Sequence, residues 1–104
     1  MEITVLWADS AIAELQDIHD YYITKAGIKV AHKITNSIVD KSLSLTNHPR
    51  IGAIEELLNH KKEEIRYLVD GNYKIVYLIE QQIVLITTIF DCRQNPEKLK
   101  KKMI

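Results

Sequence analysis

Six residues in the second half of the chain have side chains that could bind a phosphate, a nucleic-acid base or an acidic partner. They are Lys61, Lys62, Arg66, Tyr73, Tyr77 and Arg93. A guanidinium presents a planar fork of donors that matches two phosphate oxygens, and tyrosine rings can stack on bases. We therefore take all six as candidates for binding a target or a partner protein. If the chain is a nuclease, Arg66 and Arg93 are the candidate catalytic residues.

Each candidate also has a purely structural interpretation. Arg66 could pair with a nearby carboxylate such as Glu63, Glu64 or Asp91, and the tyrosines could be packing residues of a sheet. Arg93 could cap the end of a strand. The four histidines have no ligand spacing between them, so we expect no metal site and no cofactor.

Composition indicates an ordinary globular protein. The chain has 104 residues, of which 46% are hydrophobic and 27% charged, and we expect one domain over residues 1–104. No apolar run is long enough to span a bilayer, and residues 1–10 lack the pattern of a signal peptide. A single cysteine, Cys92, fits a reducing compartment. We expect a cytoplasmic protein.

The formal net charge of zero hides an asymmetry. Residues 1–60 hold five Lys or Arg against eight Asp or Glu, whereas residues 61–104 hold nine against six. The excess of positive charge is largest in the last twelve residues, where it predicts an anionic or acidic partner or else a solvated tail.

The first half predicts a strand followed by two helices. Residues 2–7 alternate as a short strand, and Asp9 or Ser10 could cap a helix whose apolar stripe has spacings of four, three and four. Gly27 would end this helix, and a second helix would run on until Pro49 stops it. The short connection predicts a helical hairpin.

The second half predicts strands at 65–69, 73–79 and 83–90, which are rich in β-branched and aromatic residues. Residues 49–62 are expected to form a loop with a helical turn over 55–58. The whole is an α+β domain of order β-α-α-β-β-β, with the helices on one face of an antiparallel meander. The first strand should join the sheet at an edge, beside the strand at 65–69 or the one at 83–90.

The dipeptide Asp70-Gly71 predicts a type I′ hairpin turn, in which these two residues are central and Arg66 faces Ile75. Arg66 would then share a face with Leu68, Tyr73, Ile75 and Tyr77. The opposite face collects Ile65, Tyr67, Val69, Val76 and Leu78, with Lys74 as its one charge. We expect that second face to pack under the helices and the Arg66 face to lie open.

The runs RYLVDGNYKIVY at 66–77 and IFDCRQNP at 89–96, preceded by two helices, resemble the RelE/ParE superfamily of toxins from type II toxin-antitoxin pairs. The resemblance extends from Ile3 to about Leu99. It implies a small cytoplasmic protein that arrests bacterial growth when free. A cognate antitoxin, whose tail wraps the toxin, would neutralise it.

One branch of the superfamily, the RelE-like toxins, consists of ribosome-dependent endoribonucleases that act without a metal. By resemblance, Arg66 matches an arginine that contacts the scissile phosphate, Lys61 and Lys62 match basic residues before that strand, and Arg93 matches an arginine after the last strand. Cleavage also needs an acid and a base. However, no histidine lies near 90–93, and no tyrosine follows Tyr77.

The other branch, the ParE-like toxins, poisons DNA gyrase and is not a nuclease. It tolerates a neutral net charge better than a protein that must dock on ribosomal RNA, because phosphate neutralisation supplies much of RNA-binding affinity. Trp7, Ala8, Ala11, Leu15 and Ile18 also form a ParE-like pattern. We favour gyrase inhibition. The alternatives are a RelE-like nuclease acting on ribosome-bound mRNA and a non-toxic member that only binds its antitoxin.

Overall fold

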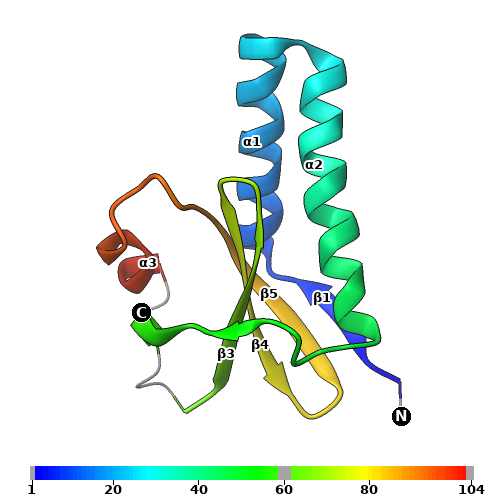
Figure 1. The fold of residues 1–104 in the computed structure, drawn as a ribbon, viewed down its shortest axis with the longest axis vertical. Helices are drawn as coiled ribbons and strands as arrows, with labels where there is room; N and C mark the ends of the chain where they lie inside the picture. Colours follow the sequence, from blue (N-terminus) through cyan, green and yellow to red (C-terminus); the bar gives the residue numbers. More distant parts are fainter. Residues whose placement is uncertain (1, 59–61, 103–104) are drawn as a thin grey trace.

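The structure is a computed structural model that describes residues 2–58 and 62–102. Figure 1 shows two long helices standing side by side above a twisted sheet and extending past its β3–β4 turn. The elements in order are β1 (Thr4–Trp7), α1 (Asp9–Ala26), α2 (Ile28–Leu43), the 3₁₀ helix η1 (Ser44–Thr46), β2 (Ala53–Ile54), the 3₁₀ helix η2 (Glu56–Leu58), β3 (Glu64–Asp70), β4 (Tyr73–Glu80), β5 (Ile83–Asp91) and α3 (Glu97–Lys102). This order confirms the predicted α+β fold.

The sheet has the strand order β1-β5-β4-β3-β2. β1 lies at an edge and pairs in parallel with β5, which is one of the two positions expected for the first strand. The other pairs are antiparallel, so the predicted meander is confirmed. The prediction missed β2, a two-residue strand on the far side of β3. So short a segment has no alternation of residue types that a sequence pattern could show.

The predicted turn between β3 and β4 was wrong by one residue. Asp70 pairs with Tyr73, so Gly71 and Asn72 are the central residues, and Arg66 faces Tyr77 rather than Ile75. Gly71 has a φ of +59°, whereas Gln81 is the only non-glycine residue with positive φ in the described chain. A positive φ at the first central residue alone is the type II′ pattern, which needs glycine there.

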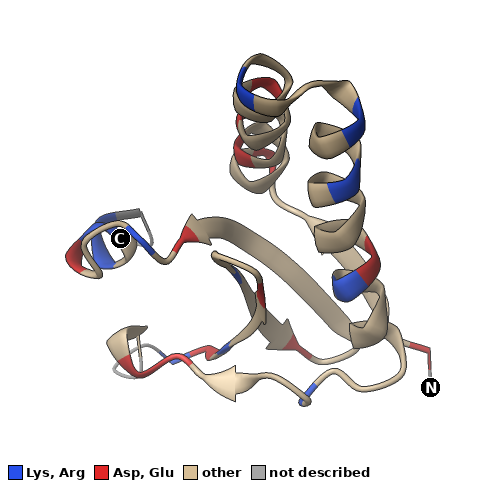
Figure 2. Ribbon diagram, turned by 45° about the horizontal axis from the view of Figure 1, so that its top comes forward, with Lys and Arg blue, Asp and Glu red and all other residues tan. Residues whose placement is uncertain are grey.

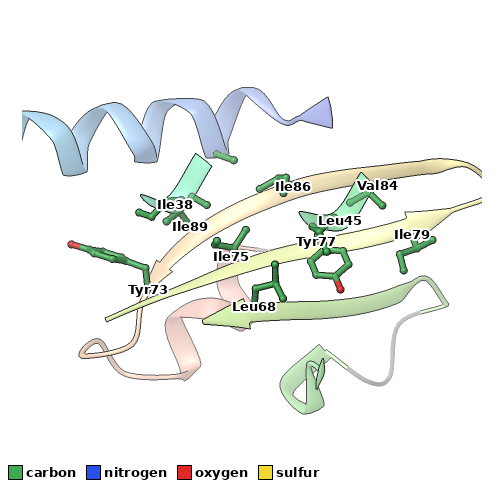
Figure 3. Packing of buried hydrophobic residues seen from close by; sticks show 11 residues of the cluster. Ile38, Leu45, Leu68, Tyr73, Ile75, Tyr77, Ile79, Val84, Ile86 and Ile89 are labelled. Atoms are coloured by element: carbon green, nitrogen blue, oxygen red, sulfur yellow. The ribbon is translucent and has the colours of Figure 1, made fainter. Parts of the chain in front are cut away.

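The predicted assignment of the sheet faces was also wrong. The face that carries Arg66 is the one under the helices, and Figure 3 shows its buried side chains below α1. The labelled residues of this face are Leu68, Tyr73, Ile75, Tyr77, Ile79, Val84, Ile86 and Ile89, and they are joined in the cluster by Ile38 of α2 and Leu45 of η1. Arg66 is tolerated on this face because it lies beside β2, where its guanidinium has polar partners. Its side chain also remains 20% exposed to solvent.

The opposite face of the sheet is covered as well. Its buried cluster consists of Leu58, Ile65, Val76, Phe90 and Leu99, which come from η2, three strands and α3. Leu99 is fully buried, so the basic C-terminal segment is packed on the sheet by one apolar side chain. Both faces of the central strands are therefore buried, which explains why their sequences are nearly continuous runs of apolar residues.

The helix boundaries differ in two places from the predicted ones. Ala8 occupies the N-cap position of α1, so no side chain caps this helix. The hydroxyl of Ser10 instead donates a hydrogen bond to the Thr87 carbonyl of β5 at 3.0 Å. The helix ends at Gly27 as expected, with a φ of +93°. α2 ends at Leu43, well before Pro49, because the chain tightens into η1 so that Leu45 can enter the core.

Candidate functional site

The structure separates the predicted site residues into two groups. Arg66 and Tyr77 are cross-strand neighbours, and both contact Gly52. Tyr73 and Arg93 lie at the other end of the sheet, where they line one cleft. Tyr73 and Tyr77 are four residues apart on one strand, or roughly 13 Å at 3.3 Å per residue.

The two predicted lysines do not add to either group. Lys62 is exposed, directly after the segment that the structure leaves out. Lys61 lies outside the described residues. The sequence therefore predicts a basic stretch before β3 that the structure tests only at Lys62.

Arg66 is engaged in a network of charged and polar groups beside β2. Its Nε donates to Oε2 of Glu64 at 2.7 Å, and its Nη1 donates to the Gly52 carbonyl at 2.7 Å. Arg50 approaches the same carboxylate, with its Nη2 donating to Oε1 of Glu64 at 2.9 Å. Glu64 therefore lies between two guanidinium groups. This is the structural interpretation of Arg66, in which the cation holds a carboxylate and a loop rather than a phosphate.

Tyr77 joins the same network through a hydrogen bond with Gly52. The residue is fully buried, and its hydroxyl oxygen accepts a hydrogen bond from the backbone N–H of Gly52 at 3.0 Å. Burial raises the pKa of the Tyr77 hydroxyl. A side chain at position 52 would clash, because a Cβ there would lie 2.5 Å from the Tyr77 hydroxyl oxygen and 2.6 Å from the Tyr67 carbonyl oxygen. Tyr77 is therefore a packing residue that has no surface to offer a target.

Replacing Glu64 by glutamine should reduce the acid sensitivity of the fold. Hydrogen bonds from Arg66, and then from Arg50, lower the pKa of Glu64 below its usual value of 4.5. The folded state thus gains stability from the ionised carboxylate above that value and loses it as the pH falls through the usual pKa toward the folded one. Urea unfolding at several pH values should show that Glu64→Gln is less stable than the parent near neutrality and changes less on acidification.

The exposed Glu56 provides the control for this comparison. Glu56→Gln should leave both the stability near neutrality and its acid dependence as they are in the parent protein. If the free energies of unfolding of the parent and of Glu64→Gln change in parallel as the pH is lowered, the network does not hold the Glu64 carboxylate in its ionised form.

The second group lines a cleft of about 380 Å³ between α1 and the end of β5, which we call the α1–β5 cleft. It is lined by Glu14, Asp17, Ile18, Tyr21, Tyr73, Ile89, Asp91, Arg93 and Gln94. Arg93 forms a two-pronged pair with Asp91, in which Nε donates to Oδ1 at 2.9 Å and Nη2 donates to Oδ2 at 2.7 Å. These bonds lower the pKa of Asp91 and raise that of Arg93.

The charge of this cleft is opposite to what a phosphate site needs. Three carboxylates line it against the single guanidinium of Arg93. One of them, Glu14, accepts hydrogen bonds from the Thr88 hydroxyl at 2.7 Å and the Ile89 N–H at 3.0 Å. Tyr73 is buried, and its hydroxyl lies 3.4 Å from that of Tyr22 on α1. The cleft can thus accept a cationic or hydrogen-bond-donating group better than an RNA backbone.

Sequence reasoning missed the partners that decide what the two arginines do. The sequence offers Glu64 as a partner for Arg66 but does not indicate Gly52 or Arg50, because these two come from a loop whose return to β3 no periodicity shows. Asp91 stands two residues from Arg93, a spacing that the sequence does show.

Within residues 2–58 and 62–102, no cluster of three or more His, Cys, Asp or Glu side chains could hold a metal ion. None of the helices in this part of the chain is long and apolar enough to cross a membrane.

Comparison with known proteins identifies the family. The family model of the ParE toxin of type II toxin-antitoxin systems, parDE, matches residues 5–96. A solved structure described as the chromosomal ParDE toxin-antitoxin system from P. aeruginosa superposes with a TM-score of 0.73. That match has 21% sequence identity over 86% of this chain and 95% of the other, and it shows a shared fold. A search of curated proteins found no significant match.

The family-model match, together with the helical hairpin and meander, identifies a RelE/ParE superfamily toxin, as the sequence predicted. Since the family model covers most of the chain, the chain belongs to the ParE toxin family of type II toxin-antitoxin systems.

Proposed function

We propose that this toxin arrests bacterial growth by inhibiting DNA gyrase and that a cognate antitoxin neutralises it. The observation that carries the proposal is the engagement of both candidate catalytic arginines with carboxylates. Arg66 holds Glu64, and Arg93 holds Asp91. A ribonuclease of the RelE type would need at least one of these guanidinium groups at the phosphate, where negative charge develops during cleavage.

Membership of the ParE family favours the same target. The acidic α1–β5 cleft supports it further, because three carboxylates would repel an mRNA phosphate. The competing function, cleavage of ribosome-bound mRNA, would require Arg66 or Arg93 to exchange its carboxylate for the phosphate.

The direct test uses the purified chain and purified gyrase with a relaxed plasmid and ATP. We expect the toxin to block supercoiling or to trap gyrase on cleaved DNA, in proportion to its concentration. It should leave messenger RNA intact in a reconstituted translation reaction. Relaxation of the same plasmid by a type I topoisomerase serves as the control for general effects on DNA. Cuts within translated codons, with gyrase unaffected, would assign the chain to the RelE-like function instead.

Neutralisation has its own test. Co-expression with the protein encoded beside the toxin gene should restore growth, and the two proteins should co-purify as a complex. If induction of the toxin alone leaves growth unchanged, the chain is a non-toxic member of the family.

A further inference from the structure

The outer side of the helical hairpin carries a seam of aliphatic and histidine side chains along the line where α1 and α2 meet. It consists of Ile12, His19 and Ile23 on α1 and of Ile28, His32 and Leu43 on α2, and we call it the hairpin seam. On α1, spacings of seven and four place the three residues on one helix face. That face is distinct from the one that packs Leu15 and Ile18 against the sheet.

The two histidines connect the two sides of the seam at one point. The rings of His19 and His32 stack with their centroids 5.0 Å apart and their planes at 21°. Around them, four apolar side chains remain open to solvent, with exposed fractions of 52% for Ile12, 40% for Ile23, 58% for Ile28 and 57% for Leu43. Aliphatic side chains gathered in this way typically mark an interaction surface.

The charges beside the seam are divided between the two helices. Figure 2 shows α1 mainly acidic and α2 mainly basic. α1 holds four carboxylates and one lysine, but two of the carboxylates, Glu14 and Asp17, line the α1–β5 cleft, so the acidic strip beside the seam consists of Asp9 and Asp20. α2 holds three lysines and one aspartate. A surface with an acidic strip on one side and a basic strip on the other is complementary to a copy of itself after a half-turn about an axis parallel to the helices.

From this arrangement we infer that a second copy of the chain covers the hairpin seam. The half-turn places α1 of each subunit against α2 of its partner, with the hairpin tips at the same level, and forms an antiparallel four-helix bundle. Each acidic strip then lies against a basic strip. Such an interface is isologous, with the same residues contributing on both sides.

The size of the surface agrees with a dimer. α2 has 16 residues and is therefore about 24 Å long, and two helices packed 8–10 Å apart give a face roughly 20 Å wide. Two such faces amount to roughly 1,000 Å², the lower end of what specific interfaces bury. The inference does not depend on the target of the toxin, and its test does not use gyrase.

Sedimentation equilibrium of the purified chain should give twice the subunit mass of 12.0 kDa. Ile28→Glu should raise the dissociation constant at least about 100-fold, because each subunit would place a carboxylate among the aliphatic side chains of the interface. Ile51→Glu is the matched control, since Ile51 is 60% exposed but lies on the loop after η1, and it should leave the dimer intact. Thermal melts establish that each variant is folded.

Charge reversal tests the orientation. Asp20→Lys on α1 and Lys29→Glu on α2 should each weaken the homodimer. Each variant gives the strip on α1 and the strip on α2 charges of the same sign, so that like charges face each other across the interface. A mixture of the two variants should form a heterodimer in which all strips are again complementary. If the parent chain sediments as a monomer, or if the two variants do not associate when mixed, the inference is wrong. A monomer whose antitoxin binding is lost on Ile28→Glu would assign the seam to the antitoxin.

Discussion

Replacing Tyr77 by alanine is expected to lower the free energy of unfolding by about 3–5 kcal/mol, the usual cost of removing a large buried aromatic side chain. Tyr77 has no exposed surface and lies in the core between Leu68, Ile75 and Ile86. Such a loss is a large fraction of the total stability of about 5–15 kcal/mol that is typical of a domain. Urea unfolding followed by circular dichroism measures the effect.

Tyr77→Phe isolates the contribution of the hydroxyl. It leaves the buried N–H of Gly52 without its acceptor, and we expect a loss of about 1–3 kcal/mol. Toxicity per folded molecule should be unchanged in this variant, because Tyr77 supports the fold and does not reach a target. A Tyr77→Phe protein that is as stable as the parent but no longer toxic would instead identify the hydroxyl as a functional group.

Replacing Leu99 by alanine is expected to cost about 2–5 kcal/mol and to release α3 from the sheet. Leu99 is the residue by which α3 enters the cluster around Phe90 and Val76. Six residues are too few for a stable isolated helix, so α3 depends on this contact. Hydrogen exchange should show faster exchange of the α3 amides in Leu99→Ala, beyond the change caused by lower global stability.

The control for Leu99 lies on the same short helix. Lys101 is exposed, so Lys101→Ala should change neither the stability nor the exchange of α3 by a measurable amount. If Leu99→Ala leaves the stability and the α3 amides as they are in the parent, the second buried cluster does not hold the C-terminal segment. α3 lies beyond residues 5–96, where the family model matches.

The order of the elements was predictable because each long element carries its own periodicity. The three strands of the meander fall within a residue or two of their predicted bounds, and Gly27 marks the end of the first helix. What failed depends on contacts distant in sequence. Leu99 sits among four lysines and was assigned to a basic tail, because its burial against Phe90 is visible only in the folded chain.

The same limit applies to the candidate site. Side-chain types marked Arg66 and Arg93 as residues that could bind a phosphate or a carboxylate, but they could not choose between the two. The sheet face was assigned wrongly because one arginine was taken as the mark of a solvent-exposed surface. At the margin of a sheet, a single guanidinium with two acceptors costs little, and the eleven buried residues of the cluster between helices and sheet decide which face is covered.

The parallel pairing of β1 with β5 has a consequence for synthesis on the ribosome. Thr4 pairs with Ile83 and Trp7 with Ile86, so the first strand finds its place only after nearly the whole chain has been made. Contacts between residues so far apart in sequence slow folding, because a long loop must close first. The nascent chain therefore carries a helical hairpin whose apolar face has no sheet to cover. The complete toxin fold, with β1 at the edge of its sheet, therefore forms only near the end of translation.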